Sequence, residues 1–137
     1  MEGQASLPVA LLAEDEPESA ASWIDVLRPN GWEVLWAPDG AAALMLAQQA
    51  KPDVLITDFD MPNMDGLALC LAFRADPALA DVPIILTSGN PLAAEKNAAA
   101  HNSFLQKPVS PLTLLATIAA LVMPKAPDVS EDQNDSS

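Results

Sequence analysis

The sequence predicts an α/β fold, a doubly wound, five-stranded parallel sheet with five helices on its two faces. Five short segments are apolar at nearly every position, which is typical of parallel strands that are covered on both faces. Segments with helical spacing of apolar residues follow them, and proline, glycine and asparagine mark the changes. At 137 residues the chain is expected to form one domain. Alternating strands and helices favour a parallel sheet.

The first strand is expected at residues 9–13, where an apolar run stops at the acidic Glu14-Asp15-Glu16. Pro17 suits the first turn of a helix, and the acids before it lie near the positive end of the helix dipole. Apolar residues at helical spacing follow, and Pro29-Asn30-Gly31 ends this helix.

The second and third units repeat the pattern. A strand at residues 32–36 precedes the turn Pro38-Asp39-Gly40, and an alanine-rich helix follows. The third strand, residues 54–57, is strongly apolar and breaks at Asp58. A loop at residues 61–66 leads into the third helix, whose start is marked by the change to helical spacing.

The fourth strand is expected at residues 84–87 and the fifth at residues 104–106. Between them, Asn90-Pro91 suits the cap and first position of a short, alanine-rich helix. Ser110-Pro111 opens the last helix, which is expected to run to about Met123.

The folded domain is expected to be residues 7–123. Residues 1–6 have no pattern and are interpreted as a flexible lead-in. Residues 124–137 are acidic and rich in proline and serine, so they cannot bury apolar surface and are expected to be disordered. The alternative for this tail is a charged interaction segment.

The net charge of −13 disfavours binding to nucleic acid or to an anionic membrane surface, because phosphates are repelled. It suits a metal cation or a protein partner with a basic face, although solubility explains it equally well. Cys70 is the single cysteine, which excludes a disulfide framework, and its apolar neighbours favour a buried, inert thiol. No membrane span or secretory signal is visible, so we expect a cytoplasmic protein.

Chemistry-bearing side chains follow four of the five expected strands. In an open parallel sheet, ligands bind beyond the carboxyl ends of the strands. The residues expected at that edge are Glu14, Asp15, Asp58, Thr87, Ser88 and Lys107. Two carboxylates about 4 Å apart repel by roughly 4 kcal/mol at an effective dielectric near 20, so such a cluster needs a cation. Mg²⁺ suits it, because Mg²⁺ takes carboxylate oxygens and phosphate oxygens together.

A carboxylate at such a site is a competent nucleophile toward phosphorus and gives an aspartyl phosphate. A lysine can neutralise phosphoryl oxygens, and a threonine hydroxyl can donate a hydrogen bond to one of them.

Residues 7–123 resemble the receiver domains of response regulators in two-component signalling, of the single-domain, chemotaxis-like kind with a flavodoxin-like sheet. The resemblance rests on four motifs: residues 11–17 (LLAEDEP), residues 52–66 (PDVLITDFDMPNMDG), residues 83–89 (PIILTSG) and residues 104–108 (FLQKP). The second motif, a strand that leads into Asp-x-x-Met-Pro-x-Met-Asp-Gly, is highly specific.

The resemblance implies that Asp58 is the phosphoacceptor and that Mg²⁺ is the cofactor. Asp15 matches the direct Mg²⁺ ligand, and Glu14 matches an acid that acts through water. The backbone carbonyl of Asp60 matches the third protein ligand. The phosphoryl donor implied is a histidine kinase or a phosphotransfer protein, and the chain then catalyses only its own phosphorylation and dephosphorylation.

The resemblance also implies a switch. Thr87 matches the hydroxyl that moves onto the phosphoryl group, Lys107 its counter-ion, and Phe104 the aromatic residue that turns inward. The Lys107-Pro108 bond resembles one that is cis in the family. Thr87 as a partner of backbone groups and Phe104 as plain core remain alternatives. The three tryptophans are interpreted as packing residues, and His101 as a helix-end residue.

Two rival functions stay open. One is a metal-dependent phosphatase that uses Asp58 and Asp60 as nucleophile and acid/base, although no cap region for a substrate pocket is evident. The other is a constitutive interaction module, whose usual sign is loss of an acid or of the lysine, and neither is lost here.

Two features of the sequence bear on the surface through which the domain would act on a partner. The segment after the fourth strand is short for the family, and residues 100–103 replace its usual turn, which leaves the fourth helix's placement open. Residues 108–124 contain no charged residue. We therefore hypothesise a partner interface, with homodimerisation as one version, through the last two helices.

Overall fold

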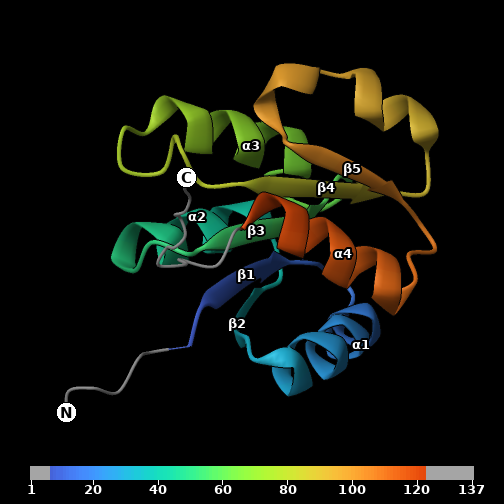
Figure 1. Ribbon diagram of the computed structural model, residues 1–137. Helices are drawn as coiled ribbons and strands as arrows, with labels where there is room; N and C mark the ends of the chain where they lie inside the picture. Colours follow the sequence, from blue (N-terminus) through green and yellow to red (C-terminus); the bar gives the residue numbers. More distant parts are fainter. Residues whose placement is uncertain (1–6, 123–137) are drawn as a thin grey trace, which may run out of the picture.

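Five parallel strands form the centre of the fold in the computed structural model, which describes residues 7–122 (Figure 1). The strands are β1 (Val9–Ala13), β2 (Glu33–Ala37), β3 (Val54–Asp58), β4 (Ile84–Ser88) and β5 (Ser103–Gln106). Their spatial order is β2-β1-β3-β4-β5, so the direction of winding reverses between β1 and β3. This is the doubly wound parallel sheet that the sequence predicts, and its switch point is where ligands bind in such folds.

Within residues 7–122, four α-helices cover the sheet, two on each face (Figure 1). They are α1 (Pro17–Leu27), α2 (Gly40–Gln49), α3 (Gly66–Ala75) and α4 (Pro111–Leu121). One core lies between the sheet and α2 with α3, and the other lies between the sheet and α1 with α4. Leu11 belongs to the first core and its neighbour Leu12 to the second. Because both faces are covered, the three central strands β1, β3 and β4 are buried at nearly every position and apolar until they reach the carboxyl edge of the sheet.

Side-chain caps explain where three of these helices begin. The carboxylate of Asp39 accepts from the Ala42 N–H and that of Asp65 from the Ala68 N–H, each at 2.8 Å. The Ser110 hydroxyl accepts from the N–H of Thr113 at 3.1 Å. These contacts satisfy backbone donors that have no partner inside the helix.

The prediction of a fourth α-helix, between the fourth and fifth strands, is wrong. Between β4 and β5 the described chain forms two 3₁₀ turns, η2 (Pro91–Glu95) and η3 (Ala98–Ala100). Asn90 caps η2 as expected, since its side chain accepts from the N–H of Leu92 at 3.0 Å. The helix does not continue because the backbone becomes extended at Lys96 and left-handed at Asn97 (φ 45°). The short connection therefore forms separate turns.

The described chain bears on several smaller expectations. Cys70 is fully buried, and burial raises the pKa of its thiol to about 12, which confirms the inert thiol. The lead-in at residues 1–6, the end of the last helix at Met123 and the acidic tail lie outside the described residues. Within residues 7–122, no helix is long and apolar enough to span a membrane.

Candidate functional site

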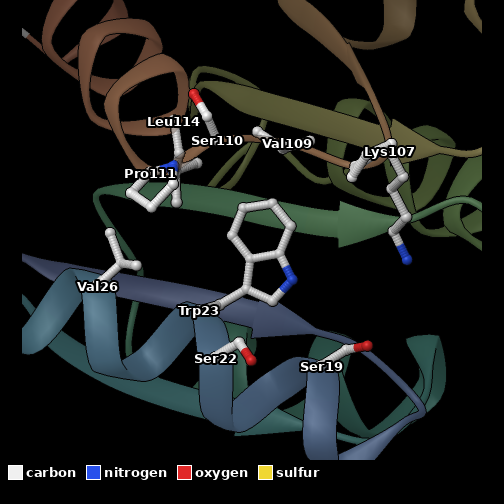
Figure 2. Close-up of a pocket in the computed structure, with 10 residues that line it drawn as sticks. Ser19, Ser22, Trp23, Val26, Lys107, Val109, Ser110, Pro111 and Leu114 are labelled. Carbon is white, nitrogen blue, oxygen red and sulfur yellow. The ribbon is translucent and has the colours of Figure 1, made fainter.

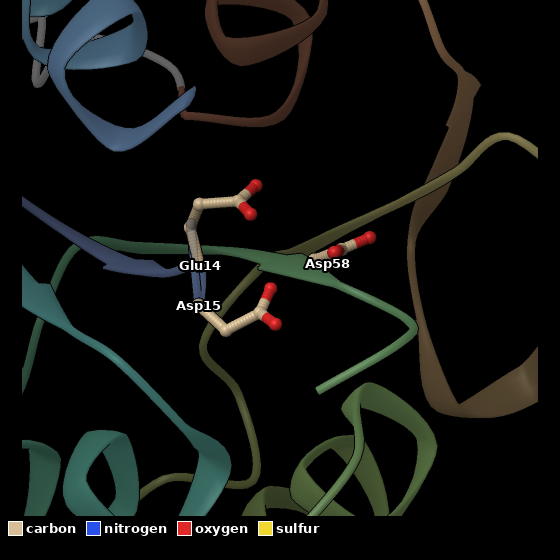
Figure 3. A group of neighbouring side chains, drawn as sticks. All are labelled: Glu14, Asp15 and Asp58. Atoms are coloured by element: carbon tan, nitrogen blue, oxygen red, sulfur yellow. The ribbon is translucent and has the colours of Figure 1, made fainter. Parts of the chain in front are cut away.

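Three carboxylates converge at the carboxyl edge of the sheet (Figure 3). Glu14 and Asp15 directly follow β1, and Asp58 is the last residue of β3. Each offers one oxygen, and the three oxygens lie within 4.8 Å of one another. The pairing of Ala13 with Thr57 explains this meeting, because Glu14 and Asp58 are the next residues along the two strands and therefore lie at the same level of the sheet. The sequence placed these three acids together correctly.

Lys107 faces two of these carboxylates. Its Nζ lies 3.3 Å from Oδ1 of Asp58 and 3.4 Å from Oε1 of Glu14. The backbone N–H of Lys107 donates to the carbonyl of Ser88 at 2.9 Å, which ties the residue to the end of β4. The Lys107-Pro108 peptide bond is cis, as the resemblance implied. The end of β5 thus directs one ammonium group toward acids from β1 and β3.

Burial shifts the pKa values of the ionisable side chains in the site. Glu14 and Asp58 are only 1% and 7% exposed, and this burial raises the pKa of both carboxyl groups against the opposing attraction of Lys107. Burial also lowers the pKa of Lys107, but Asp58 and Glu14 outweigh it, so the net shift is upward. Three carboxylates face one ammonium. Their oxygens are the ligands that Mg²⁺ prefers, so the donor set fits a divalent cation.

Each polar atom of Glu14, in the backbone and in the side chain, has a hydrogen-bond partner. Its N–H donates to the carbonyl of Ala37 at 3.0 Å, and its own carbonyl accepts from the indole Nε1–H of Trp36 at 2.7 Å. One side-chain oxygen faces Lys107, and the other accepts from the N–H of Glu16 at 3.2 Å. The sequence interpretation treated Trp36 as a packing residue and missed this contact. No local pattern could have revealed it, because it depends on how β1 and β2 pair.

The other expected site residues surround this group. Thr87 is paired with Asp58 across the sheet and is buried, and its hydroxyl donates to the carbonyl of Thr57 at 3.4 Å. Phe104 is half-buried and packs against the core under α2 and α3. Asp60 is exposed, and its charge contributes to raising the pKa of Asp58. In this conformation the Thr87 hydroxyl therefore bonds to the backbone, and Phe104 packs against the core.

A groove of about 580 Å³ opens between α1 and the segment that joins β5 to α4 (Figure 2). Its lining is mainly apolar and includes Trp23, Val26, Val109 and Leu114. Lys107 lies at one end, with its amino group directed away from the indole of Trp23. The same lysine therefore contributes to the groove and faces the carboxylates.

A family model described as the response regulator receiver domain matches residues 10–119. The transcriptional regulatory protein PrrA of Mycobacterium leprae is 34% identical over 125 residues, which are 89% of this chain and 53% of PrrA. Protein PilH of Pseudomonas aeruginosa is 30% identical over 115 residues, 82% of this chain and 95% of PilH. This chain spans about half the length of PrrA and nearly all of PilH.

Solved structures give the same result. The chemotaxis protein CheY4 of Vibrio cholerae matches with a TM-score of 0.79 and 30% identity, over 85% of this chain and 99% of CheY4. The receiver domain of the sensor histidine kinase PA1611 from Pseudomonas aeruginosa matches with a TM-score of 0.80 and 28% identity, over 85% and 98% of the two chains. That domain has a magnesium ion coordinated in its active site cleft. This chain therefore belongs to the response regulator receiver domain family of two-component signalling.

Proposed function

We propose that Asp58 accepts a phosphoryl group from the phosphohistidine of a histidine kinase or phosphotransfer protein. Phosphoryl transfer to an aspartate is the general function of receiver domains. The observation that supports Asp58 is its position at the end of β3, beside two acids and 3.3 Å from the ammonium of Lys107. The transfer takes place in the cytoplasm, where kinases obtain phosphoryl groups from ATP.

The chain's own residues supply most of the chemistry. A carboxylate oxygen of Asp58 attacks phosphorus, the bond from phosphorus to the imidazole nitrogen breaks, and the imidazole leaves with that electron pair. Lys107 keeps Asp58 ionised before the transfer and neutralises a phosphoryl oxygen after it. Glu14, Asp15, Asp58 and the carbonyl of Asp60 would hold Mg²⁺, which supplies charge neutralisation for the phosphoryl oxygens. Self-catalysed phosphorylation and dephosphorylation are then the only reactions of the chain.

The phosphoryl group then alters a surface away from the site. The Thr87 hydroxyl leaves the carbonyl of Thr57 and donates to a phosphoryl oxygen, and Phe104 repacks behind it. A change from 1:99 to 99:1 between two conformations needs about 5.5 kcal/mol of differential interaction. Two charge-assisted hydrogen bonds of roughly 1.5–3 kcal/mol each supply much of this. The contact of the Thr87 hydroxyl with the carbonyl of Thr57 supports this proposal, since the hydroxyl has a backbone partner that it can exchange for a phosphoryl oxygen.

The surface that we propose for output is formed by η2, β5 and α4. Exposed residues on it include Leu92 and Leu112, at 60% and 80% exposure, and α4 has no charged residue. A partner protein or a second copy of the chain binds there after phosphorylation. Light scattering with and without beryllofluoride tests the second version, and an unchanged mass at high concentration counts against it.

The phosphoacceptor is tested by incubation with Mg²⁺ and acetyl phosphate, followed by intact mass measurement. The wild type gains one phosphoryl group, and Asp58→Asn gains none because its amide is not nucleophilic. Asp81→Asn is the matched control, since Asp81 is exposed and pairs with Lys51 at 2.8 Å, apart from the site. Labelling of Asp58→Asn at the wild-type level would refute the assignment.

A further inference from the structure

Trp36 lies at the rim of the site although it is not one of its acids. It is the fourth residue of β2, an edge strand, and its side chain is 40% exposed. Its Nε1–H donates to the carbonyl oxygen of Glu14 at 2.7 Å, a short bond for an N–H donor. Burial of the indole is not directional, so this hydrogen bond is its most specific interaction.

The carbonyl that Trp36 contacts belongs to the peptide unit between Glu14 and Asp15. On the other side of Glu14, its N–H donates to Ala37 of the same strand β2 at 3.0 Å. The backbone of Glu14 is thus fixed by β2 both before and after its Cα. Because a peptide unit is planar, holding the Glu14 carbonyl also sets the direction in which the backbone enters Asp15.

Asp15 depends on this support more than its neighbours do. Glu14 is buried and each of its carboxylate oxygens has a partner, and Asp58 is held within the sheet. Asp15 is exposed and follows the end of β1, yet its carboxylate must stay within 4.8 Å of the other two to share a cation with them. Its orientation is therefore set mainly by its backbone.

We propose that Trp36 is a positioning residue for the metal site: its indole N–H orients the Glu14–Asp15 peptide so that Asp15 faces Asp58. This inference rests on the proposed function, because it assumes that the three acids bind Mg²⁺. Without the indole donor, the loop samples orientations in which Asp15 points elsewhere. Apparent affinity falls in proportion to the fraction of molecules that are competent to bind.

The test is Mg²⁺ binding, measured by titration calorimetry on the full chain. Trp36→Phe keeps an aromatic ring but lacks the N–H, and we expect its Kd for Mg²⁺ to rise about threefold to tenfold, since one neutral hydrogen bond is worth at most about a tenfold change. Trp32→Phe is the matched control, because Trp32 packs in the core under α1 and α4. Its Kd is expected to stay within about twofold of the wild-type value.

Separate outcomes decide between the positioning role and the proposed function. Asp15→Asn must weaken Mg²⁺ binding; if the wild type binds no Mg²⁺, or binds it independently of Asp15, the metal site itself is wrong. If Asp15→Asn weakens binding but Trp36→Phe matches the wild type, only the positioning role is overturned. An equal loss in Trp32→Phe also overturns it. Trp36→Leu gives a second test, and thermal unfolding of each variant separates a change in affinity from a change in folding.

Discussion

Gly66, the first residue of α3, illustrates how closely the backbone packs around Asp58, the proposed phosphoacceptor. A Cβ at this position would collide with the carbonyl oxygen of Asp58 and lie 2.8 Å from the Cα of Phe59. Both obstacles are backbone atoms, which cannot move aside as a flexible side chain can. The N–H of Gly66 also donates to the carbonyl of Phe59 at 2.8 Å, so the loop after β3 is fastened to the start of α3.

Gly66→Ala is therefore expected to lower the free energy of unfolding by about 1–3 kcal/mol, the usual effect of overpacking. Urea unfolding followed by circular dichroism measures it. Gly89→Ala is the control, because a Cβ there meets nothing within 4 Å. Equal midpoints for the two variants would show that the loop after β3 yields easily.

His101 gives a pH dependence that belongs to a single side chain. Its Nδ1 is buried and has no hydrogen-bond partner among residues 7–122, and burial followed by the charge of Arg74 lowers the pKa of the imidazole. The unfolded chain takes up the proton near pH 6.5, before the folded chain does. Stability is therefore lost as the pH falls below about 6.5, and above it both states are neutral at this position.

His101→Phe is expected to reduce the loss of stability between pH 7.5 and pH 5.5 relative to the wild type. The buried acids Glu14 and Asp58 contribute with the opposite sign, because their pKa values are raised, so the difference between the two proteins isolates His101. Urea unfolding at several pH values gives the measurement. Parallel stability curves for the two proteins would contradict this assignment.

For individual residues, the sequence predicted which acidic side chains lie together but not how the side chains around them are oriented. Glu14, Asp15 and Asp58 could be placed together because each ends an apolar run, and parallel strands end at one edge. The hydrogen bond from Trp36 to Glu14 could not be predicted, since it requires the pairing of two particular strands. The rotamer of Thr87, which points its hydroxyl at Thr57, is equally a matter of three-dimensional context.

Among the secondary-structure elements, α3 is tied to its surroundings chiefly through Arg74. The guanidinium donates to the carbonyls of Ala100, Ala80 and Val82 at 3.1, 2.9 and 2.8 Å and to Oδ1 of Asn102 at 2.8 Å. That Asn102 oxygen also accepts from the N–H of Ile84 at 2.7 Å, at the start of β4. One side chain thus joins α3 to the segments before β4 and β5.

Arg74→Met keeps most of the apolar stem and removes the donor from all four acceptors, of which the carbonyls of Ala100 and Val82 are part-buried. Hydrogen bonds that involve a charged group contribute about 1.5–3 kcal/mol, so a loss of at least that size in unfolding free energy is expected. Chemical unfolding is the measurement, and Arg28→Met, at an exposed arginine, is the control. A loss no larger than that of the control would mean that the four contacts contribute little.

The balance between local preference and long-range contacts explains why the prediction of a fourth helix was wrong. Asn90, Pro91 and several alanines all favour a helix locally, and the cap forms as expected. What overrides this preference is the left-handed backbone at Asn97 and the need to bring Asn102 back to Ile84 at the start of β4. Helix propensity is a weak local preference, and such long-range requirements override it.

For the whole molecule, the strand order concentrates negative charge at one edge of the sheet, and this predicts how metal affects stability. The proposed Mg²⁺ site is assembled only in the folded chain, so Mg²⁺ at 100 times its Kd is expected to raise the free energy of unfolding by about 2.7 kcal/mol. In the absence of divalent cations, Asp15→Asn is expected to be more stable than the wild type by up to about 1 kcal/mol, because one repulsive charge is removed. Saturating Mg²⁺ reverses that order in thermal unfolding. The same order with and without Mg²⁺ would count against the site.

Cys70 reports on the cooperativity of the entire fold. Cys70 belongs to α3, its side chain is fully buried in the core, and burial raises its pKa to about 12, so a thiol reagent reacts with it only after the structure opens. Labelling in native buffer is expected to be slower than in urea by several orders of magnitude, in proportion to the population of open molecules. Rapid labelling under native conditions would show that α3 detaches from the sheet without global unfolding.

The overall architecture was predictable because its determinants are local and repeated. Runs that are apolar at each position predict strands covered on both faces, and caps such as Asp39 and Ser110 mark where helices begin. The spatial order β2-β1-β3-β4-β5 was not among the predictions, since alternation alone does not fix which strands are neighbours. The packing of α1 with α4 on one face follows from that order.

The two cores on either side of the sheet raise the question of what holds β1 and β3 in register. With Leu11 facing one core and Leu12 the other, sliding a strand by one position would exchange similar side chains and lose little apolar contact. The same slip would move Glu14 into the sheet, or move Asp58 one position further from the sheet's edge, and an ionised carboxylate is strongly disfavoured inside the sheet. Glu14 and Asp58 therefore also favour one register of the strands. A chain without these acids is expected to lose that preference together with the proposed phosphoryl transfer.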